Sequence, residues 1–165
     1  MRPCKQHYDR SVARTLCVGC VFLVVLAAGC SRSSGSERAP AAFTDGSPVA
    51  RVSAIRSALA RAPAPVRLGD GTSISDCLAH DSDSGDLQNV GSMLLTVAQQ
   101  LVDSGAGDDR KLLELGYLAG AVHRGALKAQ GVDGEIERRI EQELDSVHTG
   151  SAAFARGERA GRATG

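Results

Sequence analysis

The chain has 165 residues, and its 19 basic residues balance its 19 acidic residues to a formal net charge of zero. The first 29 residues hold four of the basic and one of the acidic residues, which leaves 15 against 18 in the remainder. This balance is ordinary for a soluble domain and gives no electrostatic reason to expect a nucleic acid as partner. Beyond residue 29 the aromatic residues are Phe43, Tyr117 and Phe154, too few for the stacking platforms that bind single-stranded nucleic acid.

A short apolar segment follows a basic N-terminus. Four basic residues lie within the first 14 positions, and residues 15–31 then carry no charge over 17 positions. A helix that spans a bilayer needs about 20 apolar residues, so this segment is at the short limit. A basic start, a short apolar run and small residues at its end are typical of a secretory signal peptide. An uncleaved N-terminal membrane anchor is the alternative.

Residues 26–29, Leu-Ala-Ala-Gly, stand directly before Cys30. This ending resembles the lipobox of bacterial lipoproteins, and the resemblance covers the first 30 residues only. It implies that the Cys30 thiol receives a diacylglyceryl group, that the chain is cut before Cys30 and that the new amino terminus is acylated. Such chains anchor a protein because each buried methylene contributes about 0.8 kcal/mol. Ser31, where an Asp would resemble an inner-membrane retention signal, implies the outer membrane in a Gram-negative cell.

Composition divides the chain into four parts. Residues 1–29 form the expected signal peptide, and residues 30–46, rich in Ser, Ala and Gly, are expected to be a flexible spacer that reaches roughly 20–25 Å. Residues 47–148 are the foldable part, about one hundred residues, enough for one domain with a single core. Residues 149–165 alternate Gly, Ala and Arg, and we expect a disordered tail there because this composition cannot bury a core.

Apolar residues recur at helical spacing in four segments of the foldable part. Ser47 offers an N-cap and Pro48 suits the first turn of a helix that Pro63 stops. The later helices are predicted over residues 86–104, over residues 110–130 and from Asp133 or Gly134 to the end of the foldable part. Ser73 can cap a short additional helix.

Gly69, Asp70 and Gly71 suit a tight turn, so the residues near 66–74 also allow a very short β-hairpin. So small a ribbon is marginal by itself. We therefore predict an all-α protein, a small bundle of four main helices plus one short helix, with a disordered N-terminal spacer and a disordered C-terminal tail.

The charges of the foldable part are unevenly placed. Four arginines and no acid lie between Asp45 and Asp70, whereas eight aspartates and no basic residue occur from Leu68 to Asp109. Asp favours helix N-termini and turns, so caps explain most of these acids. The alternative is that the basic first helix docks on an acidic face, or that each surface binds an oppositely charged partner.

Two further features invite a chemical interpretation. Residues 80–86, His-Asp-Ser-Asp-Ser-Gly-Asp, offer oxygen ligands but depart from the EF-hand order at three places, so we predict a polar turn, no metal site and no cofactor.

Cys77 has no partner within the chain if Cys30 is lipidated, and nothing basic nearby would lower the pKa of its thiol. We expect it to be a small buried apolar residue, with an intermolecular disulfide or a reactive thiol as the alternative.

Gly116 and Gly120 lie four residues apart on one face of the helix predicted over 110–130, and His123 follows on that face. Glycine costs up to about 1 kcal/mol in a helix relative to alanine, so two on one face indicate a steric reason. Close approach of a neighbouring helix is one explanation. The other is a binding face, a groove for an acyl chain, a peptide or a partner helix with His123 at its mouth.

The sequence predicts no enzyme, because it contains none of the common nucleophile, metalloprotease or phosphate-loop motifs. It indicates a lipid-anchored protein of the cell envelope whose domain lies outside the cytoplasm and serves as an interaction or scaffolding module. Its expected partners are the membrane, through the lipid on Cys30, and an envelope protein or a second copy. The alternatives are a carrier of a small apolar ligand or divalent cation near Gly116, Gly120 and His123, and a hydrolase with dispersed catalytic residues.

Overall fold

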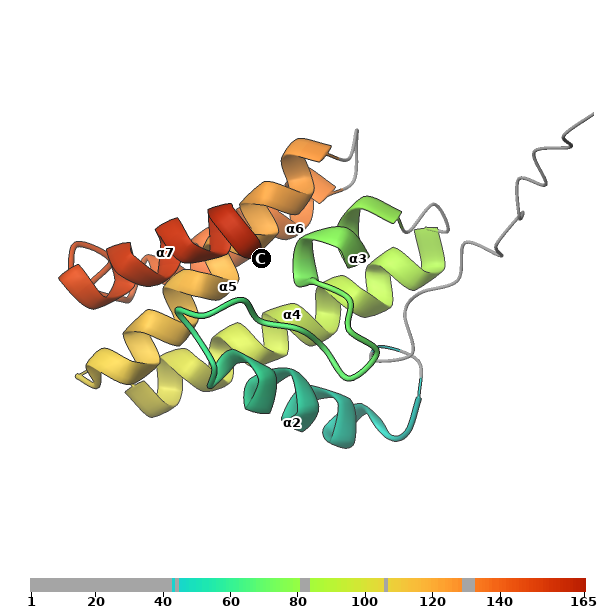
Figure 1. Cartoon of the computed structure of the whole chain (residues 1–165), viewed down its shortest axis with the longest axis horizontal. Coiled ribbons are helices and arrows are strands. Elements are labelled where there is room, and N and C mark those ends of the chain that lie inside the picture. Colours follow the sequence, from blue (N-terminus) through green and yellow to red (C-terminus); the bar gives the residue numbers. More distant parts are fainter. Residues whose placement is uncertain (1–42, 44, 81–83, 106, 129–132) are drawn as a thin grey trace, which may run out of the picture. The chain divides into compact units, whose positions relative to one another are not determined.

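The computed structural model describes residue 43 and residues 45–80, 84–105, 107–128 and 133–165. This part of the chain contains six helices and no β-strand (Figure 1). The helices are α2 (Pro48–Leu59), α3 (Ile74–His80), α4 (Ser84–Gly105), α5 (Asp109–Lys128), α6 (Asp133–Leu144) and α7 (Ala152–Thr164). The predicted bundle of four main helices and one short helix is confirmed in α2, α4, α5, α6 and α3. The expected signal peptide and Cys30 lie outside the described residues.

α2 begins where its sequence predicts. The Ser47 hydroxyl accepts a hydrogen bond from the Ala50 N–H at 3.2 Å, and Pro48 takes the first helical position, where its missing N–H costs nothing. Its buried apolar residues recur at helical spacing and are Val52, Ile55, Ala58 and Leu59. Phe43, which lies within the expected spacer, is only 1% exposed, so the core includes a residue that precedes the predicted start of the domain.

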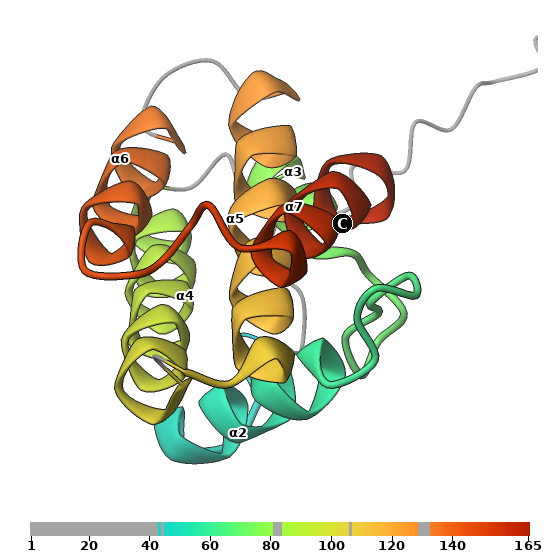
Figure 2. The same ribbon diagram turned by 90° about the vertical axis from the view of Figure 1, so that its left-hand side faces the viewer.

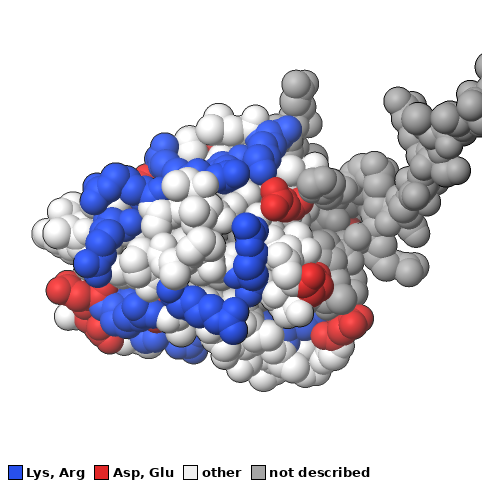
Figure 3. All heavy atoms as spheres, viewed as in Figure 1, with Lys and Arg blue, Asp and Glu red and all other residues white. Residues whose placement is uncertain are grey.

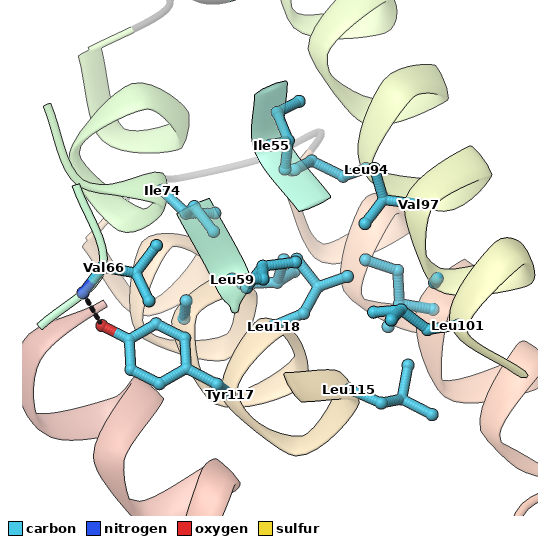
Figure 4. Close-up of a cluster of buried hydrophobic side chains, with 14 of the residues drawn as sticks. Ile55, Leu59, Val66, Ile74, Leu94, Val97, Leu101, Leu115, Tyr117 and Leu118 are labelled. Atoms are coloured by element: carbon cyan, nitrogen blue, oxygen red, sulfur yellow. Dashed lines mark hydrogen bonds between the residues drawn. The ribbon is translucent and has the colours of Figure 1, made fainter. Parts of the chain in front are cut away.

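The segment between α2 and α3 is a turn and does not form the β-hairpin that its sequence allows. The Leu68 N–H donates to the Thr72 carbonyl, and the Gly71 N–H donates to the Leu68 carbonyl, each at 2.9 Å. Gly71 has a φ of 86°, a conformation that glycine adopts without steric cost. The Val66 N–H donates to the Tyr117 hydroxyl at 2.9 Å (Figure 4), so its hydrogen bond goes to a helix and not to a strand. The burial of Val66 and Leu68 against the helices therefore determines the path of this segment.

α5 lies at the centre of the bundle and contacts each of the other five helices. The buried side chains around it come from α2, the segment after α2, α3 and α4 (Figure 4). They are Ile55, Leu59, Val66, Ile74, Leu94, Val97 and Leu101, and α5 itself adds Leu115 and Leu118 to the same core cluster. Each such side chain contributes about 1.5–3 kcal/mol when it is fully buried, so this cluster holds the helices together. Cys77 is also fully buried, which confirms its predicted place in the core.

α7 forms within residues 149–165, where we expected a disordered tail, and that prediction is wrong. The Ser151 hydroxyl caps the helix by accepting the Phe154 N–H at 3.1 Å. The buried residues of α7 are Ala153, Phe154, Gly157 and Gly161. α7 packs across α5 (Figure 2). The composition suggested disorder because it offers few large apolar side chains, but α7 is held mainly by close contact between main chains.

Candidate functional site

The expected binding face at Gly116 and Gly120 is covered by α7 of the same chain. A Cβ atom on Gly116 would clash with the Phe154 carbonyl oxygen, and one on Gly120 would clash with the Glu158 carbonyl oxygen. The contact is reciprocal, because a Cβ atom on Gly157 or Gly161 of α7 would clash with main-chain oxygens of α5. Glycines four residues apart on both helices thus allow the two backbones to touch, which is the close helix approach that the spacing predicts. The expectation that the two glycines bind an outside ligand is therefore corrected.

His123 lies beside this glycine contact and pairs with α6. Its Nδ1 atom is 2.5 Å from Glu137 Oε1 on α6, and both side chains are partly exposed. The pair lines a pocket of about 290 Å³ between α5, α6 and α7, and Glu158 and Arg162 of α7 also line it. The structure therefore pairs His123 with Glu137, a carboxylate that the sequence did not single out.

Tyr117 links three distant segments of the fold. Its ring is fully buried, its hydroxyl accepts the Val66 N–H, and Thr164 Oγ1 on α7 lies 3.0 Å from the same hydroxyl. Because the Thr164 hydroxyl donates to the Ala160 carbonyl at 3.0 Å, the Tyr117 hydroxyl is the donor in that pair. These bonds fix the segment after α2 beside the C-terminal end of α7.

Glu114 is a buried carboxylate in the middle of a leucine-rich helix. Its side chain is 3% exposed, and its two oxygens receive Arg110 Nε at 3.1 Å and Lys111 Nζ at 3.2 Å. Arg110 also donates to the Ala62 carbonyl at 2.8 Å and to the Ala60 carbonyl. The arginine therefore ties the first turns of α5 to the end of α2. In the sequence this site shows only as an acid between two leucines with an arginine four positions before it, a pattern that does not by itself predict a buried carboxylate.

A groove of about 650 Å³ lies between α2 and α4 and reaches Lys111 and Glu114 of α5. Its apolar side chains include Val52 and Met93, which belong to the core. The hydroxyl groups that line it belong to Ser53, Ser57, Ser92 and Thr96. Val49, also in the lining, is 80% exposed and is one of the large apolar side chains that the described surface leaves open to solvent. A groove with an apolar floor and polar walls can take a peptide or another elongated ligand.

Two arginines of α2 give the groove a basic wall. Arg51 Nη1 donates to the Phe43 carbonyl, while Arg51 Nε is buried and has no hydrogen-bond partner among the described residues. Arg56 Nη1 donates to the neutral side chain of Gln100 at 3.2 Å. Within the described part of the chain neither arginine forms an ion pair, so a carboxylate in the groove would gain a guanidinium partner. The arrangement suits a ligand that carries carboxylates.

Several aspartates lie at the starts of helices, as the sequence predicts. Asp108 accepts the Arg110 N–H at 2.8 Å at the start of α5, and Asp76 lies in the first turn of α3, where Ser73 accepts its N–H at 3.2 Å. Residues 81–83 of the polar run lie outside the described residues. Among the residues that were described, no three His, Cys, Asp or Glu side chains are grouped so that they could hold a metal ion.

The α6 surface carries an ion pair between Glu135 and Arg139, at 2.8 Å, and Arg138 joins it at 2.7 Å. The hydrogen bonds from Arg138 and Arg139 lower the pKa of Glu135 from 4.5 to about 2. Arg138 and Arg139 are exposed and Glu135 is partly exposed, so these pairs belong to a solvated surface, where an ion pair contributes little to stability.

No helix in the described part of the chain is long and apolar enough to cross a bilayer. Comparison of the chain with protein families, with curated proteins and with solved structures finds no match.

Proposed function

We propose that this protein is a lipid-anchored lipoprotein of the cell envelope whose helical domain is a non-enzymatic interaction module. The resemblance of residues 26–30 to a lipobox supports the anchor on Cys30. The α2–α4 groove supports the interaction, and the observation that carries it is that Arg51 and Arg56 line the groove without an ion pair among the described residues. The partner is an envelope protein that inserts a segment bearing carboxylates.

The groove favours such a segment in two ways. Val52 and Met93 offer apolar area, which gives affinity in proportion to the surface removed from water. Arg51 and Arg56 offer guanidinium donors, which bind carboxylates more strongly than neutral acceptors do. Lys111 is already paired with Glu114, so the arginines of α2 and not the lysine supply the unpaired positive charge.

In-cell photocrosslinking tests this proposal. A photoreactive amino acid at Ser57, exposed in the groove, should capture a specific protein, whereas the same group at Gln142, exposed on α6, should not. Arg56→Glu should abolish the capture and Arg56→Lys should retain part of it. Equal capture from both positions, or capture that survives Arg56→Glu, would contradict the proposed groove.

The anchor is tested separately through Cys30→Ser. The substitution should release the processed protein from the membrane fraction, because the thiol that receives the lipid is gone. A processed mutant that stays in the membrane would contradict lipidation, whatever the groove binds.

The pocket beside His123 supports a second function, a carrier of a small apolar ligand. Its apolar lining includes Val122, Ile140, Leu144 and Phe154. A carrier should unfold at a higher temperature in the presence of a lipid extract, because a ligand that binds only the folded state stabilises it. Narrowing the pocket with Ala119→Leu should remove that increase.

A further inference from the structure

Arginine side chains gather on one face of the domain, formed by α7 and the segment between α2 and α3 (Figure 3). We define this basic face by Arg61, Arg67, Arg124, Arg156, Arg159 and Arg162. Arg61, Arg67, Arg156 and Arg159 are exposed, and within the described part of the chain they form no ion pair.

The fold, and not the sequence order, assembles this face. Arg61 and Arg67 are separated from Arg156 by about ninety residues of chain. Tyr117 joins the two segments through Val66 and Thr164, and the Ser75 hydroxyl donates to the Gly165 carbonyl just beyond α7. Arg124 donates to the Arg162 and Ala163 carbonyls at the C-terminal end of α7. Because α7 packs its glycines against α5, its arginines must point outward.

We propose that the basic face lies against anionic phospholipid headgroups. Each Lys or Arg close to such a surface adds attraction that falls off within about 8–10 Å at physiological salt. The chain after residue 29 has more acidic than basic residues, 18 against 15, so an anionic surface attracts the domain through a local basic surface and not through its net charge. The proposal goes beyond the protein partner in the groove and rests on the proposed lipid anchor only for bringing the domain to a membrane.

Two further observations favour a bilayer as the anionic partner. Leu127, one turn beyond Arg124 on α5, is 75% exposed, and an exposed leucine beside basic residues can enter the headgroup layer. Cys30 is 13 residues from the buried Phe43, so a lipid on Cys30 keeps the domain within roughly 45 Å of the bilayer even if this segment is fully extended.

Arginine footprinting tests the proposal on the full, lipidated chain in vesicles. Phenylglyoxal modifies accessible guanidinium groups, and mass spectrometry follows each arginine separately. Adding phosphatidylglycerol to phosphatidylcholine vesicles should slow modification of Arg61, Arg156 and Arg159 several-fold. Arg138 and Arg139, exposed on α6, should react at the same rate in both vesicles and serve as internal controls. High salt should remove the difference, because the attraction is electrostatic.

A pair of variants makes the test specific. The Arg156→Gln, Arg159→Gln double variant should return Arg61 and Arg67 to the rate seen without phosphatidylglycerol, while the Arg156→Lys, Arg159→Lys variant should keep their protection. Thermal unfolding should be unchanged in both variants, because these side chains are exposed. The proposal is overturned if anionic vesicles protect Arg138 and Arg139 equally, or if protection requires an added protein. The crosslink from Ser57 tests the groove and the footprinting tests the basic face. Failure of one experiment therefore does not contradict the proposal that the other one tests.

Discussion

Gly120 of α5 lies so close to the Glu158 carbonyl of α7 that no side chain fits between the two helices. This relationship explains why a glycine-rich segment folds at all. Each glycine loses the burial energy of a side chain, but it lets two helix backbones touch and lets Cα–H groups approach carbonyl oxygens. The same contact removes Gly116 and Gly120 from the surface that an outside ligand could reach.

Gly120→Ala should destabilise the domain by about 1–3 kcal/mol, because the added methyl group would overlap a main-chain atom and push α7 away. Chemical denaturation followed by circular dichroism measures the change. Gly134→Ala is the matched control, since Gly134 lies in α6 with open space around it. The control should be neutral or more stable by up to about 1 kcal/mol, as alanine is the better helix former. Equal effects of the two substitutions would show that helix propensity, and not the contact with α7, governs both sites.

Tyr117→Phe should cost about 1–3 kcal/mol, because it leaves the buried Val66 N–H without an acceptor. Thr164→Val removes the other partner of the tyrosine hydroxyl and should cost less, since the bond to Val66 remains. Both values come from urea denaturation at neutral pH. A larger loss for Thr164→Val than for Tyr117→Phe would contradict the central role assigned to the tyrosine.

Arg110→Ala should destabilise the domain by roughly 2–4 kcal/mol, because it leaves the buried Glu114 with Lys111 alone and frees the Ala60 and Ala62 carbonyls. Arg110→Lys should recover only part of the loss, since an ammonium cannot reproduce the fork of guanidinium donors. Arg159→Ala, an exposed arginine on α7, should change stability by less than about 0.5 kcal/mol. A full recovery with lysine would show that charge alone is needed at residue 110.

The carboxyl of Glu135 should titrate near pH 2 in the folded protein, well below the ordinary value of 4.5. Because the pKa is lower in the folded protein than in the unfolded chain, any stabilisation from this group is fully present at pH values above the ordinary pKa of 4.5. It is lost as the pH falls toward 2. Arg138→Gln should raise the pKa of Glu135 toward its ordinary value while Arg139 still holds it partly down. Carbon-detected NMR of the carboxyl groups follows both variants, and an unchanged titration in Arg138→Gln would contradict the assigned cause.

The sequence by itself determined the five helices that carry a local signal. Ser47 and Pro48 predict the start of α2, and leucines at three- and four-residue spacing predict α4 and α5. Both kinds of pattern depend only on residues within one or two helical turns. The burial of Cys77 in the core was likewise predicted from the sequence.

Only the tertiary structure decided what those helices face. α7 has little local signal of stability, and it exists because Gly157 and Gly161 meet the backbone of α5, which lies about forty residues earlier in the chain. The buried Glu114, the groove beside Arg51 and the basic face likewise depend on side chains brought together from separate elements. Local patterns determine which segments form helices, but long-range packing decides which surfaces stay open, and function depends on those open surfaces.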